Sequence, residues 1–301
     1  MFRHLLVPLD GSALAEAVLP VVGAISLKTG ARVTLLHVLE HHAARTIHDQ
    51  RHLTARDEAE SYLRDTAARA LPAGVAATWH VHEREVRNVA ESVAAHAAEL
   101  TPDLVVMCAH AEGKLRDWWF GNLPQQVVDL GSVPVLLVRP TDGAGGTFRR
   151  ILLPLDVKPE HEGALSPATA LARLFGAALQ ALVVVPTPGA LAGPQAVTGS
   201  LLPSATRALL ELAETEAAAY AGRLLERLQD EGCAASATVR RGRPLSVIAD
   251  FAAANRTDLI AVGTHGKSGT RAFWEGSMAQ RLIRRIPVSF LLAPVPSGTD
   301  G

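Results

Sequence analysis

A glycine-rich segment in the last quarter of the chain carries the residues best suited to hold a ligand. Gly263 closes an apolar run, Gly266 follows three residues later, and Gly276 and Ser277 precede a helical pattern. Residues without Cβ let the backbone approach a bulky group closely. The free N–H groups of a helix start favour an anion, and Ser277 is a good N-cap residue. The spacing therefore predicts a loop that holds a phosphate.

Two familiar nucleotide motifs are absent from this segment. A P-loop ending at Gly266 would need glycine where Ala261 stands, and no GxGxxG follows an apolar run. Lys267 and Ser268 would add a charge and a hydroxyl to the loop. Glycine-rich segments also serve as plain turns between a strand and a helix, so that reading stays open at this point.

The composition limits the classes of function. The chain has 301 residues, enough for about two domains, with 48% hydrophobic and 20% charged residues, which is globular. Its 29 basic residues against 30 acidic ones create no global field for nucleic acid or an anionic membrane. Aromatic content of 4% argues against stacking platforms for single strands. We therefore expect neither nucleic acid nor a membrane as a partner.

The cysteines and the amino terminus point to a cytoplasmic protein. Cys108 and Cys233 are too few and too isolated for a disulfide framework or a zinc site, and we expect two reduced, inert thiols. The opening MFRHLLVPLDGS leaves no room for a signal peptide. No stretch approaches the roughly 18 uninterrupted apolar residues of a membrane span.

An internal repeat defines the organisation of the chain. FRHLLVPLD at 2–10 recurs as FRRILLPLD at 148–156, and TPDLVVMCAH at 101–110 matches TDLIAVGTHG from 257 onward. The second copy has gained residues between these motifs, most naturally in the Gly- and Pro-rich segment 186–203, which reads as a loop. We expect domains at 1–140 and 148–296, joined by a flexible linker at 141–147.

Short apolar runs alternate with amphipathic helical patterns in each copy. The runs DLVVM, DLIAV and VPVLLV are nearly continuous, as buried parallel strands require. The alternation predicts an α/β fold with a mostly parallel sheet covered on both faces. In such sheets ligands bind past the carboxyl ends of the strands. The glycine-rich segment follows one of those ends.

The glycine spacing resembles the ATP-binding signature of the universal stress protein family. Supporting matches are LVPLDGS, LLPLD, LLHV, GRP at 242–244, DLIAVGTHG and the closing IPVSFLLAP, which together cover nearly all of both halves. The resemblance implies a tandem member with two Rossmann-like (adenine nucleotide alpha hydrolase-like) domains. Each would hold a five-stranded parallel sheet with helices on both faces. The halves would pair as such domains pair in dimers, and a homodimer of the chain is also compatible with the resemblance.

The resemblance assigns the nucleotide contacts residue by residue. It implies that Asp156 and its two neighbours meet adenine and ribose, that Val184 lines the base pocket, and that the glycines and Ser277 take the phosphates. Asp156 is also a routine turn former at a strand end. Some ATP-binding members carry a hydroxyl residue where this chain has Ala279. The full expected set is Pro154, Leu155, Asp156, Val184, Gly263, His265, Gly266, Lys267, Gly276, Ser277, Met278 and Ala279.

The first half departs from this signature. Each added Cβ crowds the surface that phosphates would approach, and two new carboxylates would repel them. The changed positions are Cys108, Ala111 and Asn122 in place of Gly263, Gly266 and Ser277, with Glu112 and Asp117 in place of Lys267 and Ala272. Pro8, Leu9 and Asp10 are kept. We expect a degenerate, structural first half, and the alternative is a site with an altered ligand.

Several functions fit this sequence. The first is an ATP-binding regulatory module of the stress response, with one adenine nucleotide, with or without Mg²⁺, in the second half. The alternatives are a slow ATP hydrolase or nucleotidyl transferase, and a nucleotide-free scaffold. Hydrolysis needs a group that positions water, and the sequence offers no convincing catalytic base near the glycine loop.

Two other groups of residues invite weaker hypotheses. His48 and His52 would share one helical face at i, i+4, and a solvated helix face is favoured over a metal site. His110 and His265 occupy matching loop positions, where packing or loop geometry is favoured. For the aromatic segments 118–120 and 273–274, packing is favoured over a lid on the nucleotide.

Overall fold

The computed structural model describes residues 2–40, 46–47, 50–86, 88–109, 123–140, 146–191, 201–264 and 276–294. The chain divides into two compact units. The first comprises Met1–Thr147, Thr264–Ser268 and Ser289–Pro294, and the second comprises Phe148–Gly263, Gly269–Val288 and Val295–Gly301. Most of the expected linker, 141–145, lies outside the described residues.

The first unit is built on a predominantly parallel sheet. Its strand order is β12-β7-β6-β1-β2-β5, and every pairing is parallel except that of β12 with β7. A separate two-stranded hairpin pairs β3 with β4. The strands are β1 (His4–Pro8), β2 (Arg32–Glu40), β3 (Thr46–Ile47), β4 (Gln50–Arg51), β5 (Ala77–Val86), β6 (Leu104–Cys108), β7 (Val135–Val138) and β12 (Ser289–Pro294).

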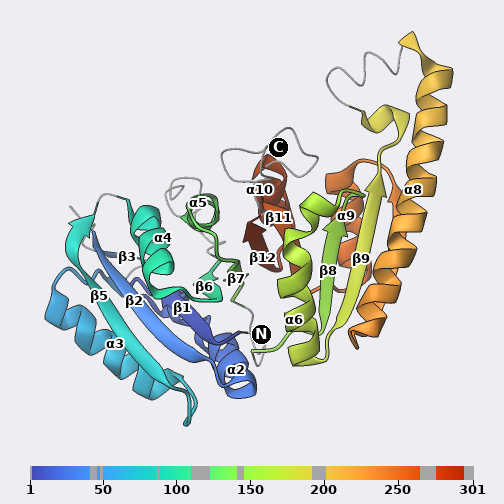
Figure 1. Ribbon diagram of the computed structural model, residues 1–301. Coiled ribbons are helices and arrows are strands. Elements are labelled where there is room, and N and C mark those ends of the chain that lie inside the picture. The colour runs from blue at the N-terminus through green and yellow to red at the C-terminus, as the bar shows by residue number, and fades with distance from the viewer. Residues whose placement is uncertain are drawn as a thin grey trace. The chain divides into compact units, whose positions relative to one another are not determined.

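Helices cover both faces of this sheet (Figure 1). Helices α2 and α3 lie on one face, and α4 and α5 on the other. At Gly23 of α2 an added Cβ would lie 2.6 Å from Cδ of Pro72, so glycine permits the close approach of α2 to the turn that follows α3. The helices are α1 (Ala13–Glu16), α2 (Leu19–Thr29), α3 (Arg56–Ala70), α4 (Val89–Leu100) and α5 (Leu123–Leu130).

The second unit repeats the same plan. Its strands run in the order β10-β9-β8-β11, with parallel pairing. Helix α6 lies in front of the sheet in the view of Figure 1 and α9 lies behind it. The elements are β8 (Arg150–Leu155), η1 (Pro159–Ala164), α6 (Leu165–Phe175), β9 (Ala178–Val185), η2 (Pro188–Ala190), α8 (Pro203–Asp230), β10 (Ala235–Arg241), α9 (Pro244–Ala254), β11 (Leu259–Thr264) and α10 (Gly276–Arg285).

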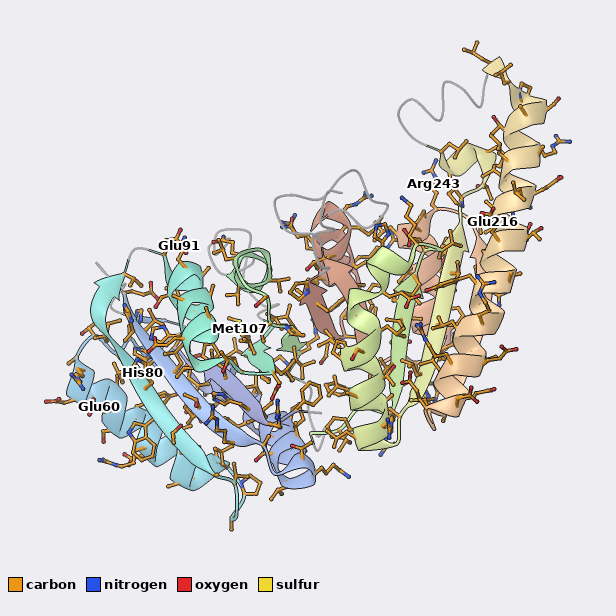
Figure 2. The ribbon with its side chains drawn as sticks, viewed as in Figure 1. Glu60, His80, Glu91, Met107, Glu216 and Arg243 are labelled. Carbon is orange, nitrogen blue, oxygen red and sulfur yellow. The ribbon has the colours of Figure 1, made fainter. Side chains whose placement is uncertain are left out.

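The expected α/β fold is confirmed, and its core explains the apolar runs. Leu5 and Leu6 of β1 are fully buried, as are Ile151 and Leu152 of β8, because both sides of a covered parallel strand face side chains rather than water. Charged side chains such as Glu60 and Glu216 lie on the outward sides of α3 and α8 (Figure 2). None of the helices within the described ranges is long and apolar enough to cross a membrane.

The extra residues of the second repeat lie beside a longer helix. Helix α8 has 28 residues, whereas its counterpart α3 has 15. Of the segment 186–203, which was expected to be a loop, the described part contains the short helix η2 and the start of α8 at Pro203. Leu209 and Leu212 near that start are 66% and 55% exposed. The insertion therefore changes the helical layer and leaves the strand order intact.

An aspartate fixes the start of the first strand in each unit. Asp103 Oδ2 accepts hydrogen bonds from the backbone N–H groups of Arg3 at 2.6 Å and His4 at 2.9 Å. Asp258 repeats the arrangement, since its two oxygens accept from Arg149 N at 2.8 Å and Arg150 N at 3.0 Å. These carboxylates connect strands that are about 100 residues apart in the chain.

We predict that Asp258→Ala lowers the free energy of unfolding by about 2 kcal/mol, because charged acceptors contribute about 1.5–3 kcal/mol to a hydrogen bond. Urea denaturation followed by circular dichroism measures the change. Asp258→Asn, which keeps one acceptor oxygen, should lose less. The control is Asp250→Ala on the exposed side of α9, and an equal loss in that variant would contradict the assignment.

Candidate functional site

The strand ends of the second unit bring three expected site residues to one edge of the sheet. Leu155 ends β8, Val184 lies one residue before the end of β9, and Gly263 is the penultimate residue of β11. In the parallel registers Leu155 is opposite Val183 and Ile151 is opposite Leu259. Strand β9, which follows β8 in the chain, lies on one side of β8, and β11 lies on the other side. Asp156 and Gly263 therefore flank the point at which the strand order reverses. In parallel sheets of this kind, ligands bind at such switch points.

The residues at this edge differ in burial and polarity. Leu155 and Val184 are 2% and 4% exposed, and because Leu155 is opposite Val183, the side chains of Leu155 and Val184 lie on opposite faces of the sheet. Gly263 is half-buried and adds no side chain beside them. Asp156 supplies a carboxylate that is 13% exposed at the same edge. A carboxylate at this edge can accept hydrogen bonds from ligand hydroxyls.

Asp156 is held by two partners that the sequence did not suggest. Its Oδ1 accepts from the backbone N–H of Lys158 at 3.1 Å, and its Oδ2 lies 2.6 Å from Nδ1 of His161. The imidazole side chain is 6% exposed. A carboxylate offers about four lone-pair sites, so two such contacts leave room for ligand hydroxyls. The carboxylate is therefore oriented in advance rather than free to rotate.

The short helix η1, which carries His161, is itself tied to α8. Glu162 accepts hydrogen bonds from the Tyr220 hydroxyl and from Arg227 Nη2, both at 2.7 Å. Burial, followed by the hydrogen bond to Glu162, raises the pKa of Tyr220, so the phenol stays protonated and donates. Arg227 is half exposed, and water weakens its pairing with Glu162. Helix α8 thus sets the position of η1, and η1 sets the position of Asp156.

The phosphate end of the expected site is described only in part. Helix α10 begins at Gly276, so Ser277, which was expected to cap it, lies inside its first turn. Met278 is half-buried and Ala279 is 3% exposed. His265, Gly266 and Lys267 lie outside the described residues, as do 110–122 of the first half.

The first unit keeps the strand end but not its surroundings. Pro8 ends β1, Leu9 is 3% exposed, and Asp10 Oδ1 accepts from the backbone N–H of Ser12 at 2.8 Å. At the position of His161 this half carries Ala15, and at the position of Gly263 it carries Cys108, which ends β6. The imidazole that orients Asp156 therefore has no counterpart on the matching turn after β1.

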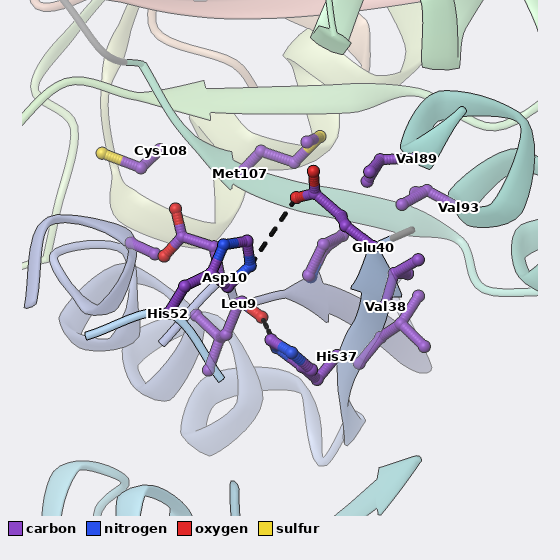
Figure 3. A pocket seen from close by; sticks show the side chains of 13 residues that line it. Leu9, Asp10, His37, Val38, Glu40, His52, Val89, Val93, Met107 and Cys108 are labelled. Carbon is purple, nitrogen blue, oxygen red and sulfur yellow. Dashed lines mark hydrogen bonds and ion pairs between the residues drawn. The ribbon is translucent and has the colours of Figure 1, made fainter. Parts of the chain in front are cut away.

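A pocket of about 60 Å³ nevertheless lies at this edge of the first unit (Figure 3). Apolar side chains, including Val38, Val93 and Met107, form most of its wall. Its polar members are Asp10, His37, Glu40 and His52. Strand ends of β1, β2 and β6 and helix α4 contribute to it, so its place in the first repeat matches that of the candidate site in the second.

The placement of His52 corrects the sequence interpretation. We expected His48 and His52 on one solvated helix face, but residues 46–47 and 50–51 form the β3–β4 hairpin, and α3 begins only at Arg56. The strands of the hairpin place His52 against the pocket, where it is 4% exposed. His41, His42 and His48 lie outside the described residues.

Two histidines of the pocket differ in their hydrogen bonding. Nδ1 of His37 donates to the carbonyl oxygen of Leu9 at 2.7 Å, and burial lowers the pKa of His37 below its usual value, which keeps this ring neutral. Among the residues that the structure describes, neither ring nitrogen of His52 has a hydrogen-bond partner. Its Nε2 lies 3.8 Å from Oε1 of Glu40, too far for a hydrogen bond (Figure 3).

A second histidine cluster does not form a metal site. The rings of His80 and His82 on β5 lie 4.9 Å and 5.0 Å, centroid to centroid, from that of His96 on α4. His96 Nδ1 is 2.7 Å from the carbonyl oxygen of Ser92. Within the ranges that the structure describes, no three His, Cys, Asp or Glu side chains are arranged to hold a metal ion.

Sequence reasoning missed His161, Glu40 and His52 as members of these two sites. A comparison of the repeats contains part of the signal, since His161 aligns with Ala15 next to an aspartate that both copies keep. His52 gave no such signal, because its burial depends on a hairpin of only two residues on each side.

Both cysteines are buried thiols outside any disulfide, and we predict that neither reacts in the folded protein. Burial, with a smaller effect of Asp10, raises the pKa of Cys108 to about 12, and burial also raises the pKa of Cys233. At pH 8 only about one Cys108 thiol in ten thousand is then ionised, and the thiolate is the nucleophile. Titration with an aromatic disulfide reagent should show both thiols reacting only in denaturant. Rapid reaction of either thiol at pH 8 in the native state would contradict this.

Comparison with known proteins places the chain in a family. The model of the universal stress protein family matches residues 1–139 and again 147–294. A universal stress protein of Methanocaldococcus jannaschii is 25% identical over 149 residues, which cover 50% of this chain and 84% of that protein.

Solved structures agree on the fold over the whole chain. A putative universal stress protein from Pseudomonas aeruginosa UCBPP-PA14 superposes with a TM-score of 0.67 at 16% identity, over 97% of this chain and 93% of that one. A universal stress protein from Archaeoglobus fulgidus gives a TM-score of 0.62 at 16% identity, over 97% and 96% of the two chains. Two matches to the family model, one in each repeat, show that this chain belongs to the universal stress protein family, as a tandem member.

Proposed function

We propose that this protein is a regulatory module of the stress response that binds one ATP, with or without Mg²⁺, at the strand ends of its second half. The observation that carries the proposal is the convergence of Asp156, Val184 and Gly263 at the switch point of β8 and β11. Adenine would lie against Val184, and the ribose hydroxyls would donate to Asp156. Gly263 and the start of α10 at Gly276 would face the phosphates.

The proposal assigns only one nucleotide to each chain. In the first half the Cys108 side chain stands at the position of Gly263, and the carboxylate of Glu40, which lines the nearby pocket, stands where the second half has Pro186. This additional negative charge would repel a polyphosphate. The first half would then serve as the structural partner of the second.

Pairing of the two repeats within the chain is part of the same proposal. Strand β12, which comes from the second repeat, is antiparallel to β7, with Phe290 opposite Leu137 and Leu292 opposite Val135. The Ser289 hydroxyl accepts from the backbone N–H of Arg139 at 3.0 Å. Pairing of β7 with β12 supports a regulatory role. A nucleotide bound in the second half would change how firmly β12, the last strand of that half, pairs with β7.

The first prediction concerns stoichiometry and the two aspartates. Protein denatured after purification should release about one adenine nucleotide per chain, measured by mass spectrometry. Asp156→Ala should weaken ATP binding by at least about tenfold in calorimetry, because it removes hydrogen bonds to a charged acceptor, about 1.5–3 kcal/mol each. Asp10→Ala is the matched control and should leave ATP affinity unchanged. Two nucleotides per chain, or equal losses in the two variants, would refute the single-site proposal.

The second prediction concerns His161 as a residue that positions Asp156. The wild type should prefer ATP to 2′,3′-dideoxy-ATP, which lacks the hydroxyls that Asp156 would accept. His161→Ala should reduce that preference by about threefold or more, since the carboxylate loses one of its two oriented contacts. His161→Asn, which retains a side-chain N–H, should restore part of it.

Lys158→Ala provides the control for this experiment, because the contact from residue 158 to Asp156 comes from the backbone. A purely structural role of His161 would lower the affinity for both nucleotides equally. That outcome would argue against positioning while leaving ATP binding itself intact.

A further inference from the structure

The contact between η1 and α8 has a counterpart in the first unit. Glu162 accepts a hydrogen bond from Arg227 Nη2 on α8 at 2.7 Å. Glu16, which occupies the matching position of the first repeat, accepts one from Arg69 Nη2 on α3 at 2.8 Å. Helix α3 precedes β5 as α8 precedes β10, so the two contacts join corresponding elements. Each unit therefore ties the turn after its first strand to the corresponding helix.

A tyrosine lies about two helical turns before each of these arginines. The Tyr220 hydroxyl donates to Glu162, with 2.7 Å between the two oxygens. Burial, followed by the charge of Glu16, raises the pKa of Tyr62, so this phenol also lies beside the glutamate of its unit. We call each such set a clamp: Glu162, Tyr220 and Arg227 form the α8 clamp, and Glu16, Tyr62 and Arg69 form the α3 clamp.

The residue before the glutamate decides what each clamp can hold. His161 precedes Glu162, and its Nδ1 lies 2.6 Å from Oδ2 of Asp156. In the first repeat Ala15 precedes Glu16, and a methyl group cannot make such a contact. Because a planar peptide bond joins neighbouring residues, a glutamate held by its side chain restrains the backbone from which the imidazole projects. The α8 clamp therefore has a route through an imidazole to the strand-end carboxylate, and the α3 clamp lacks that route.

Within the α8 clamp the tyrosine provides the stronger constraint. Tyr220 is 7% exposed, and a hydrogen bond away from water is electrostatically stronger. The Arg227 side chain is 47% exposed, so solvent weakens its pairing with Glu162. After burial and the hydrogen bond to Glu162, the charge of Asp156 also contributes to the raised pKa of Tyr220, so the phenol lies near that carboxylate. Loss of the Tyr220 hydroxyl should therefore loosen η1 more than loss of the Arg227 guanidinium.

We propose that the α8 clamp, chiefly through Tyr220, positions the Asp156 carboxylate for the ribose hydroxyls of the nucleotide. Tyr220 is a positioning residue in this scheme, because its hydroxyl acts through Glu162 and η1. The inference rests on the ATP site proposed above and extends that site to α8, so that recognition of ribose depends on how α8 packs. The α3 clamp has the same residue types without the imidazole, and it provides an internal control.

Proton NMR of the ligand-free chain tests the positioning without any nucleotide. The Nδ1 proton of His161, held against the Asp156 carboxylate, should give a downfield signal that is protected from exchange with water. Its absence in His161→Asn identifies it. Tyr220→Phe, which keeps the ring, should weaken or remove that signal because η1 is held less firmly. Tyr62→Phe, the matched change in the α3 clamp, should leave it unchanged.

Calorimetry with ATP and 2′,3′-dideoxy-ATP tests the consequence for the ligand. Tyr220→Phe should reduce the preference for ATP by about threefold or more, because Asp156 is less well oriented towards the ribose hydroxyls. Tyr62→Phe should keep the wild-type preference. Glu162→Gln retains an acceptor oxygen for the phenol, so its effect should fall between those of the wild type and Glu162→Ala. The Glu162 variants also provide the test if Tyr220→Phe does not fold.

The outcomes separate this inference from the nucleotide proposal. An unchanged His161 signal in Tyr220→Phe and Glu162→Ala would overturn it, and so would an unchanged preference in variants that still bind ATP. Equal changes in Tyr62→Phe would also overturn it, because they would show a general loss of stability. If the wild type binds no ATP, the nucleotide proposal fails, and the His161 signal still decides whether the clamp positions Asp156.

Discussion

Parallel pairing between neighbouring strands is the constraint on which both candidate sites depend. In the first unit β1 runs parallel to β2, with His4 opposite Arg32 and Pro8 opposite Leu36. In the second unit β8 runs parallel to β9, with Leu155 opposite Val183. Because parallel strands share one direction, the residues that follow them lie together at one edge of the sheet. A polar side chain at the end of one strand is therefore close to the ends of the neighbouring strands, and no long loop is needed to position it. Asp103 and Asp258 hold the other edge, where β1 and β8 begin.

The two repeats show that a few substitutions give the same fold different charged and polar groups at the strand ends. In the second unit Asp156 lies 2.6 Å from His161, and η1 is linked through Glu162 to Tyr220 on α8. In the first unit the corresponding turn has no imidazole, and a histidine from a different segment, His52, lies against the pocket instead. Both halves keep an aspartate after the first strand. They differ at other strand ends, where Cys108 replaces Gly263, and in the connecting segments, which supply His161 in one half and His52 in the other.

The chain belongs to the universal stress protein family, and its second unit carries a hydrogen-bond network that leads away from Asp156. The described residues around Asp156 are arranged to orient an acceptor, and the network behind them reaches α8, the helix that the second repeat has lengthened to 28 residues. The network therefore links the position of Asp156 to a helix that carries exposed apolar residues such as Leu209 near one end.

Local patterns in the sequence determined the repeat, the α/β class and the strand ends at Asp10, Asp156 and Gly263, because apolar periodicity and strand-terminating residues act over a few neighbours. The same patterns were misleading for His52, where a helix was expected and a hairpin formed. Only the tertiary structure decided that Glu162 meets Tyr220, 58 residues away, that β12 of the second repeat pairs with β7, and that His52 is buried without a hydrogen bond to any described residue. These outcomes depend on how helices and connections pack across the sheet, and packing between distant residues leaves no periodic mark in the sequence.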